Sequence, residues 1–442
     1  MSTLLSRRDL IAAAGAAALL PVCRAAGTEL PAPARPSANP LHVDPPPEPL
    51  PRVSRFESLG LGLFMHYGLY SLWERGEWIM HFAKIPKNDY LARLKEFRAN
   101  DFDGRAIARL AKDAGMRYAC MTARHHDGFS LYDTHTLSDW DITKTSAGRD
   151  IVEDFVEGCR AEGVTPFLYH TTLDWTHPDF NTDFPAYLDY LHQSVEMLCT
   201  NYGTLGGLWF DGNWSRPDAD WKESRLYSVI RRHQPDAIII NNTGTEARGK
   251  PGNPEIDALT FEVGRPSQVD QRGRDKYLAA EMCQTTSMSA WGYAPLDFNH
   301  RSLPQIIEDV CVCRAARANY LLNVGPTPAG SIRDFDAAVL RRLGDWVRHC
   351  GNAVYDGRAG AITPRDPRDG ALLGNGRAWF LVRDPGRPAV FEGMPSTVKS
   401  ARWCDTNEEV AFTQAGGTLN LKTTPPPYAV NTVVRVIEAS LT

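Results

Sequence analysis

A carboxylate ends a short apolar segment in the middle of this chain. Asp211 follows the residues 206–210, and Gly212 comes directly after it. In enzymes built from parallel β/α units, catalytic groups stand at the ends of the strands, where a turn exposes the side chain. The structural alternative is an aspartate that caps the next helix. Asp211 alone leaves both interpretations open.

Other predicted strands end in residues of the same kind. The residues at these ends are His66, His125 with His126, Tyr169 with His170, and Glu262, and Glu77 with Trp78 comes a little after the first of these strands. A single histidine is more often structural than functional, but such residues at the same end of successive strands indicate an active site. The chain also has 11 Trp and 15 Tyr, and flat aromatic rings stack on the apolar faces of sugars. Most of these rings are expected in the core, and the use of such rings in sugar-binding clefts makes a carbohydrate a candidate ligand.

The run His125-His126-Asp127 raises the question of a metal site. Adjacent residues on an extended chain point to opposite faces, so both histidines would rarely bind one ion. Hydrogen bonding to sugar hydroxyls needs no metal. We expect neither a metal nor a cofactor.

Alternating strands and helices are predicted from about residue 58 to 350. Val152, Phe155, Val156 and Cys159, for example, recur at helical spacing. Strands are predicted at 61–65, 118–121, 164–168, 208–210, 237–240, 258–261, 278–281 and 320–324. This alternation predicts the α/β class and a (β/α)8-type barrel, complete or imperfect, over residues 53–351.

The pattern changes after residue 352, where short alternating segments are separated by Gly, Pro and Asp. Segments at 378–382, 397–403, 419–421 and 432–437 predict a small β-sandwich over 352–442. A domain that braces the barrel is the favoured interpretation, and an accessory carbohydrate-binding module is the alternative.

The N-terminus has the features of an export signal. Arg7-Arg8 precede the small apolar stretch 12–20, which predicts a twin-arginine signal peptide over 1–26. Cys23 leaves a degraded lipoprotein site as an alternative. A Pro-rich leader is predicted at 27–52, and no later segment has the roughly 18 apolar residues of a membrane span. We expect an exported, periplasmic protein.

Charge and cysteine content add two expectations. The net charge is −5 and no Lys/Arg block appears, which argues against nucleic acid as a partner. Eight cysteines follow the signal without metal-binding spacing, and we interpret them as buried thiols, with Cys311 and Cys313 open to pairing after export. The oligomeric state is not indicated.

Several motifs together resemble the α-L-fucosidases, glycoside hydrolase family 29, from about 58 to 350. They are His66-Tyr67-Gly68, Glu77-Trp78, His125-His126-Asp127-Gly128-Phe129, Leu168-Tyr169-His170, Leu208-Trp209-Phe210-Asp211-Gly212, Glu281-Met282-Cys283, Trp291-Gly292-Tyr293 and Tyr320-Leu321-Leu322-Asn323-Val324-Gly325-Pro326. The resemblance implies a barrel followed by a β-sandwich. It also implies exo-acting, retaining hydrolysis of terminal α-L-fucose from fucosylated oligosaccharides or glycoconjugates.

The same resemblance implies roles for individual residues. Asp211 would be the nucleophile, and Glu262, in the context Asp-x-x-Thr-x-Glu, is preferred to Glu281 as the acid/base. The sugar-binding residues would be His66, Glu77, Trp78, His125, His126, Tyr169, His170, Trp209 and Trp291.

Two departures from the family pattern keep other functions open. Tyr67 stands where Trp is usual, and Ile79 stands where an aromatic residue is common. Both are expected to reshape the pocket, so a glycosidase for a related sugar such as α-L-galactose is one alternative. A catalytically silent fucose-binding lectin is the other.

Overall fold

The computed structural model of the protein describes residues 45–350 and 352–442. The predicted signal peptide (1–26) and the leader up to residue 44 lie outside the described residues.

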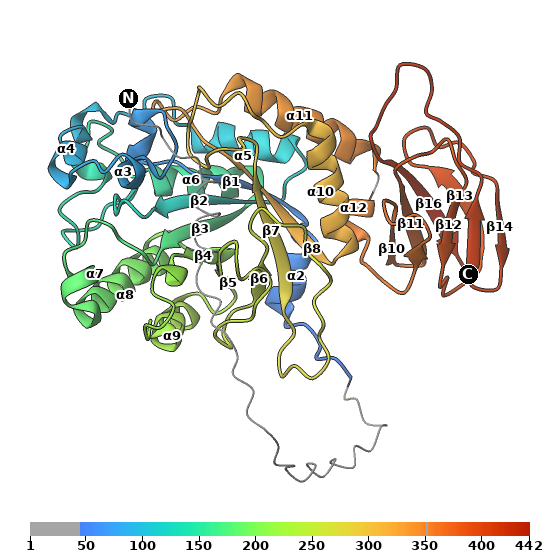
Figure 1. Ribbon diagram of the computed structural model, residues 1–442, viewed down its shortest axis with the longest axis horizontal. Helices are drawn as coiled ribbons and strands as arrows, with labels where there is room; N and C mark the ends of the chain where they lie inside the picture. The colour runs from blue at the N-terminus through green and yellow to red at the C-terminus, as the bar shows by residue number, and fades with distance from the viewer. Residues whose placement is uncertain (1–44, 351) are drawn as a thin grey trace, which may run out of the picture. The chain divides into compact units, whose positions relative to one another are not determined.

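Eight parallel strands form a closed barrel in the order of the sequence (Figure 1). They are β1 (Leu61–Met65), β2 (Tyr118–Arg124), β3 (Thr165–Thr171), β4 (Gly207–Asp211), β5 (Ile238–Asn241), β6 (Ala258–Thr260), β7 (Ala279–Thr285) and β8 (Ala318–Val324). The barrel closes between β1 and β8, where Leu61 pairs with Tyr320. The predicted fold class is confirmed.

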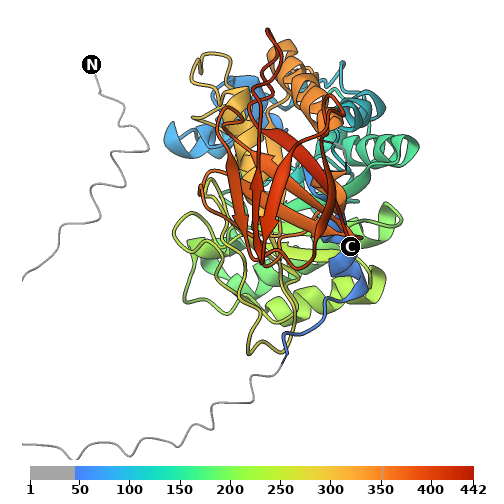
Figure 2. The same ribbon diagram turned by 90° about the vertical axis from the view of Figure 1, so that its right-hand side faces the viewer.

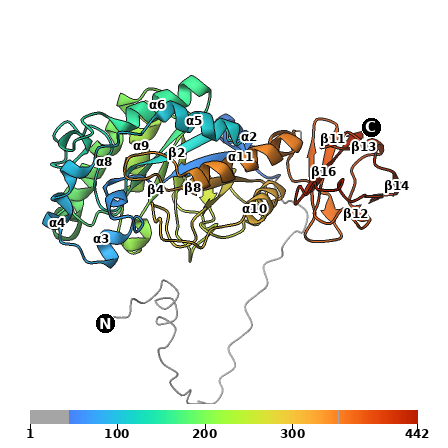
Figure 3. The same ribbon diagram turned by 90° about the horizontal axis from the view of Figure 1, so that it is seen from above.

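The outer layer of helices is incomplete. It consists of α5 (Gly104–Asp113), α6 (Ile151–Glu162), α8 (Phe184–Asn201), α9 (Glu223–His233), α10 (Leu303–Ala315) and α11 (Asp334–His349), and Figure 3 shows α10 and α11 beside β8. In the described chain, β5 and β6 are each followed by a long connection without a helix. The barrel is therefore an imperfect (β/α)8 barrel.

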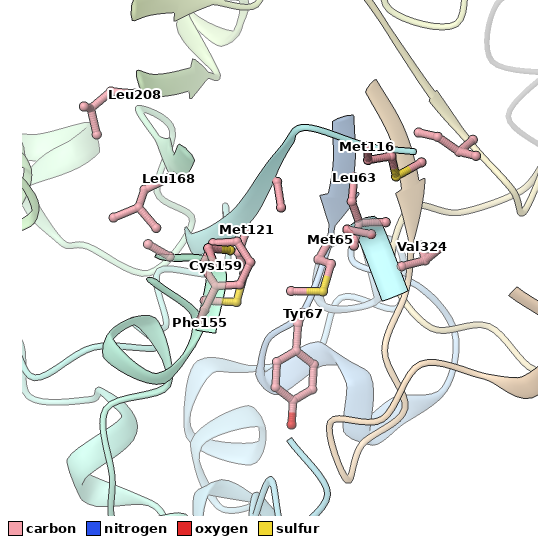
Figure 4. Close-up of a cluster of buried hydrophobic side chains, with 14 of the residues drawn as sticks. Leu63, Met65, Tyr67, Met116, Met121, Phe155, Cys159, Leu168, Leu208 and Val324 are labelled. Carbon is pink, nitrogen blue, oxygen red and sulfur yellow. The ribbon is translucent and has the colours of Figure 1, made fainter. Parts of the chain in front are cut away.

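Alternate residues of each strand face two different cores. The outward residues pack under the helices, as Figure 4 shows for Met121 of β2 beside Phe155 and Cys159 of α6. The inward residues fill the barrel with large rings, among them Phe64, Phe167 and Trp209. Because this interior is solid, a ligand can enter only at the carboxyl ends of the strands.

A short helix closes the opposite end of the barrel. Val53 and Phe56 of α2 (Pro51–Leu59) belong to the interior core. Arg52 forms an ion pair of 3.0 Å with the buried Asp257, the residue directly before β6. The last residues of the predicted leader are therefore part of the folded barrel.

The C-terminal region contains two antiparallel sheets that face each other (Figure 2). One sheet has the order β10 (Gly370–Gly374), β11 (Arg377–Val382), β16 (Arg435–Leu441) and β13 (Val398–Trp403). The other has the order β14 (Phe412–Ala415), β15 (Thr418–Leu421), β12 (Ala389–Glu392) and β9 (Thr363–Pro364). Trp346 of α11 donates its indole N–H to the carbonyl of Val434 over 3.0 Å, and Val434 and Val436 extend the core that the helices share with the barrel. The C-terminal region therefore packs directly against the last barrel helix.

All eight cysteines of the described residues are free thiols, including Cys311 and Cys313. Among the helices of the described chain, none combines the length and the apolar character needed to cross a bilayer.

Candidate active site

Asp211 is the last residue of β4 and is held from both sides of its carboxylate. Its Oδ1 accepts from Trp214 Nε1 over 2.8 Å and from Asn242 Nδ2 over 3.2 Å. Its Oδ2 accepts from the Tyr169 hydroxyl over 3.1 Å, and His126 Nε2 lies 3.4 Å from the same oxygen. A fixed carboxylate with two partners on each oxygen is suited to act as a nucleophile or a charge stabiliser.

Gly212 makes this exposure of Asp211 possible. Its φ of 117° lies in a region that favours glycine, and an added Cβ would lie 2.6 Å from the backbone nitrogen of Leu173. The chain therefore turns away immediately after the strand, and the side chain of Asp211 keeps 14% of its surface exposed to the pocket.

The surroundings of Asp211 keep it ionised. Burial by itself would raise the pKa of this carboxyl group, but hydrogen bonds from His126, Trp214 and Tyr169 and the electrostatic effect of His126 outweigh burial. The pKa of Asp211 is therefore lowered from its ordinary value of 3.8.

Glu262 lies two residues beyond β6 and is linked to Asp211 through one side chain. Asn242, directly after β5, donates from Nδ2 to Glu262 Oε2 over 2.9 Å and to Asp211 Oδ1 over 3.2 Å. These two oxygens therefore lie no more than about 6 Å apart, the two distances laid end to end. The sequence-based choice of Asp211 and Glu262 is compatible with this pairing.

Three histidines line the pocket beside the carboxylates. His66 follows β1, and its Nδ1 lies 2.8 Å from Asn323 Oδ1. The His66 ring is 5.4 Å from the His125 ring, which is 4.2 Å from the His126 ring. Burial lowers the pKa of His66 to about 4 and the pKa of His125 well below 6.5. Both rings are therefore neutral near pH 7 and act as hydrogen-bonding groups.

The expectation that His125 and His126 point to opposite faces is wrong. Both residues follow the end of β2, where Gly128 N donates to the His125 carbonyl over 2.9 Å and closes a turn. The alternation of an extended strand does not apply in a turn, so both rings reach the pocket. Nδ1 of His125 is buried without a partner in the described chain, which leaves a polar atom for a ligand hydroxyl. The described residues contain no group of three or more His, Cys, Asp or Glu that could hold a metal ion.

Glu77 fixes the position of Trp291 rather than standing free in the pocket. Its Oε2 accepts from the backbone nitrogens of Trp291 and Gly292, each over 2.8 Å. Asn323 of β8 donates to the carbonyl of Trp291 over 2.7 Å. The Trp291 ring, anchored at three backbone atoms, lies 5.2 Å from the His66 ring.

Aromatic rings form the floor and one wall. Tyr169 and Trp209 stack at 5.5 Å with their planes 21° apart, and both are buried at the top of the barrel core. Trp78 stacks on Trp214 at 6.0 Å and on the exposed Phe82 at 5.5 Å. The pocket thus ends on a closed aromatic floor and opens beside exposed rings.

Two other predicted residues, His170 and Glu281, lie outside the pocket. His170 is in the strand position next to Tyr169 and therefore points outward, where its Nε2 lies 2.7 Å from Ser194 Oγ of α8. Glu281 is 1% exposed and lies within the barrel, where it accepts from the Tyr118 hydroxyl over 2.5 Å and from Trp209 Nε1 over 2.9 Å. We therefore leave His170 out of the proposed site and treat Glu281 as a support of its floor.

The two departures from the family pattern also fall outside the pocket. Tyr67 packs against Phe97 and Phe102 in the outer core, and Figure 4 shows its ring extending away from Met65. Ile79, the first residue of α3 (Ile79–Phe82), belongs to the same outer core. The expectation that these two residues reshape the pocket is wrong.

Trp214, Asn242 and Asn323 complete the site and were not predicted. Asn242 directly follows β5 and Asn323 is the next-to-last residue of β8, so attention to the carboxyl ends of strands would also have selected them. Trp214 is in a turn three residues after Asp211, and its role depends on folding that the sequence pattern does not show.

A pair of linked carboxylates in a neutral, aromatic pocket at the mouth of a β/α barrel defines a glycoside hydrolase. Residues 45–352 match the family model of alpha-L-fucosidases, and the chain therefore belongs to the alpha-L-fucosidase family. It is 26% identical over 375 residues to the tissue alpha-L-fucosidase of Rattus norvegicus, which covers 78% of this chain and 77% of the rat protein.

Solved structures agree with this family assignment. The chain resembles alpha-L-fucosidase isoenzyme 1 from Paenibacillus thiaminolyticus with a TM-score of 0.78 and 31% identity, over 89% of this chain and 99% of that one. It shares the fold of an alpha-L-fucosidase from Bacteroides thetaiotaomicron trapped as a covalent intermediate with 2-fluoro-fucosyl fluoride (TM-score 0.78, 20% identity, 90% of this chain and 98% of that one).

Proposed function

We propose that the protein is an exo-acting, retaining α-L-fucosidase that releases terminal α-L-fucose from fucosylated oligosaccharides or glycoconjugates, with Asp211 as nucleophile and Glu262 as acid/base. The observation that carries this proposal is the shared amide of Asn242, which keeps one oxygen of each carboxylate within about 6 Å of the other. Retaining glycosidases hold their carboxyl groups about 5–5.5 Å apart, and inverting enzymes hold them roughly 6.5–9.5 Å apart. The spacing therefore favours direct attack by Asp211 over attack by an interposed water.

The reaction has two displacements at the anomeric carbon. In the first, an oxygen of Asp211 bonds to the anomeric carbon, the glycosidic bond breaks, and the proton of Glu262 moves to the leaving oxygen. In the second, Glu262 takes a proton from water, the water oxygen attacks the anomeric carbon, and the bond to Asp211 breaks. Two inversions give net retention.

The depth of the pocket supports exo action. Tyr169 and Trp209 are buried and close it from below, and the anchored Trp291 stands at its side. A sugar in contact with Asp211 has no path deeper into the barrel. It must therefore be the terminal residue of a glycan, with the rest of the glycan leaving past the exposed rings of Trp214 and Phe82.

The test uses 4-nitrophenyl α-L-fucoside, with 4-nitrophenyl α-L-galactoside as the matched substrate. We expect wild-type turnover of the fucoside, and proton NMR at early times should show α-L-fucose as the first product. Asp211→Gly should lower kcat by at least about 1000-fold, because the covalent step is lost. Added azide should restore turnover and give the β-fucosyl azide.

Three outcomes would contradict the proposal. They are β-fucose as the first product, Asp211→Gly with near wild-type kcat, and a clear preference for the galactoside. Circular dichroism of the variant serves as the control for folding.

We further propose export by the twin-arginine route and a periplasmic location, on the basis of Arg7-Arg8 and the apolar stretch 12–20. Replacing Arg7 and Arg8 with Lys should leave the full-length protein in the cytoplasmic fraction. Processing and secretion of that double variant at the wild-type level would refute the route.

A further inference from the structure

We propose that Asn242 is the positioning residue of the catalytic pair, which holds nucleophile and acid/base on one amide nitrogen and directs the exchangeable proton to Oε1 of Glu262. This inference rests on the proposed function and adds a residue to it. Asn242 is 3% exposed, and its Nδ2 donates to Asp211 Oδ1 over 3.2 Å and to Glu262 Oε2 over 2.9 Å. Both hydrogens of the amide are therefore used by the two reacting carboxylates, and none is left for a sugar hydroxyl.

The orientation of the Asn242 amide is determined by its other end. Its Oδ1 accepts from the backbone nitrogen of Gly244 over 3.1 Å and from the hydroxyl of Thr260 over 3.0 Å. The Thr260 hydroxyl itself accepts from the backbone nitrogen of Thr243 over 3.3 Å, so its single hydrogen is directed to Asn242. Two donors converge on Oδ1, and the NH2 group must therefore face the carboxylates.

This orientation decides where the proton of Glu262 resides. The NH2 group of Asn242 has no lone pair to accept a hydrogen bond, so a proton on Oε2 would face another donor. The protonated acid therefore has its hydrogen on Oε1, and Oε2 accepts from Asn242. Oε1 is the atom from which the proton passes to the leaving oxygen.

The shared amide also suits both halves of the reaction. Before the first displacement the negative charge of the pair is on Asp211, and after it the charge is on Glu262. Asn242 touches both carboxylates and can stabilise the charge in either place without moving. A hydrogen bond donated to an ionised carboxylate is stronger than one donated to a neutral carboxyl group. The amide therefore stabilises whichever of the two carboxylates is ionised at each stage.

The pH dependence of kcat/KM separates this role from simple packing. Five ionisable groups face the pair. They are His66 after β1, His126 after β2, Tyr169 of β3, Cys283 of β7, and Arg248, which donates to the Glu262 carbonyl. These remain in Asn242→Ala, so a shift of the profile reports the lost amide. Because donation favours ionised carboxylates, its loss should move the acid limb, set by Asp211, about one unit to higher pH. The alkaline limb should move in the same direction.

The size of the effect follows from two hydrogen bonds to charged groups. We expect kcat/KM for 4-nitrophenyl α-L-fucoside to fall roughly 10- to 100-fold in Asn242→Ala. Asn242→Asp should lower kcat/KM more than Asn242→Ala does, although Asp has nearly the shape of Asn, because it brings a third carboxylate and removes the donor. A packing role predicts the opposite order.

The matched control is Asn241, the same residue type one position earlier. Its amide points away from the pocket and donates to Glu223 over 3.0 Å and to the Tyr227 hydroxyl over 2.9 Å. Asn241→Ala should leave the pH limits of kcat/KM in place. Thr260→Val removes one anchor of Asn242 without touching either carboxylate, and it should shift the profile in the same direction by less.

Each outcome decides one question. Two results, each obtained with a wild-type enzyme that hydrolyses the fucoside, would overturn the role of Asn242 alone. One is a pH profile of kcat/KM that is unmoved in both Asn242→Ala and Thr260→Val. The other is a smaller loss of kcat/KM in Asn242→Asp than in Asn242→Ala. Absence of wild-type turnover would overturn the proposed function and this inference with it.

Discussion

Replacing Glu281 with glutamine should stabilise the protein at alkaline pH while leaving its stability at pH 5 nearly unchanged. Glu281 faces the inside of the barrel from β7 and is 1% exposed. Burial raises its pKa from 4.5 to about 7, although the Tyr118 hydroxyl and the Trp209 indole both donate to it and favour the ionised form. The carboxyl group is therefore protonated in the folded protein at pH values where it is ionised in the unfolded chain.

The magnitude follows from that difference. A group with a raised folded pKa contributes stability that is fully present below the unfolded pKa and is lost as the pH rises through the folded pKa. For Glu281 this window runs from pH 4.5 to about 7, and a shift of this size corresponds to about 3 kcal/mol. Glutamine does not ionise, so Glu281→Gln avoids this loss. Its carbonyl can accept from Trp209 and its amide can donate to the Tyr118 oxygen, which keeps both contacts.

The assay is urea denaturation followed by tryptophan fluorescence at pH 5 and at pH 8. We expect the difference in unfolding free energy between variant and wild type to be about 3 kcal/mol more favourable at pH 8 than at pH 5. Glu96→Gln, an exposed glutamate paired with Arg93, is the control and should show no such pH dependence. An equal effect of Glu281→Gln at both pH values, or a loss of stability at pH 8, would refute the burial of a protonated carboxyl group here.

Two further predictions concern the assignment of the site. Glu262→Ala should lower kcat/KM for fucosides with sugar leaving groups at least about 100-fold more than for an aryl fucoside with an acidic phenol, because only the poor leaving group needs the proton. Equal losses for the two substrates would contradict the acid/base role of Glu262. The same selectivity in Glu281→Gln would assign that role to Glu281. His170→Ala should lower the free energy of unfolding by about 1–3 kcal/mol, through the lost contacts to Ser194 and the Thr171 carbonyl, and leave KM for the aryl fucoside unchanged. A large rise in KM in a fully folded variant would show instead that His170 contacts the substrate.

The barrel strands could be predicted because each is a short apolar run bounded by turns. The predicted strand at 61–65 has the same bounds as β1, and the other seven overlap their observed strands. Helix α11 was not predicted, although Ala337, Leu340 and Val347 are buried and their spacing in the sequence is typical of a helix. In the sandwich, β9, β10, β12 and β14 were not predicted, because strands of two to five residues give few alternations to detect, although the equally short β15 was predicted.

Some site residues could likewise be predicted from the sequence, and others could not. Strand ends were enough to find Asp211 and Glu262, because the fold brings all such ends to one edge. They were not enough to separate Tyr169 from His170, since neighbouring residues of one strand face opposite sides and the motif contains both. Trp214 depends on the conformation of a turn, and Glu281 depends on depth within the barrel. Neither property has a local pattern in the sequence.

Depth and hydrogen-bond donors, rather than residue type, separate the carboxyl groups of Asp211 and Glu281. Asp211 at the mouth has two partners on each oxygen, and its pKa is lowered, whereas Glu281 inside the barrel has two donors in all, and its pKa is raised to about 7. The two are connected, because Glu281 accepts from Trp209, Trp209 stacks under Tyr169, and Tyr169 donates to Asp211. Glu281 thus acts on the chemistry through the floor that it supports, while Asn242 acts directly on the pair above. A carboxyl group fixed inside the barrel costs little to bury up to about pH 4.5, and the cost grows as the pH rises toward 7. Throughout this range it keeps the ring beneath the nucleophile in one orientation.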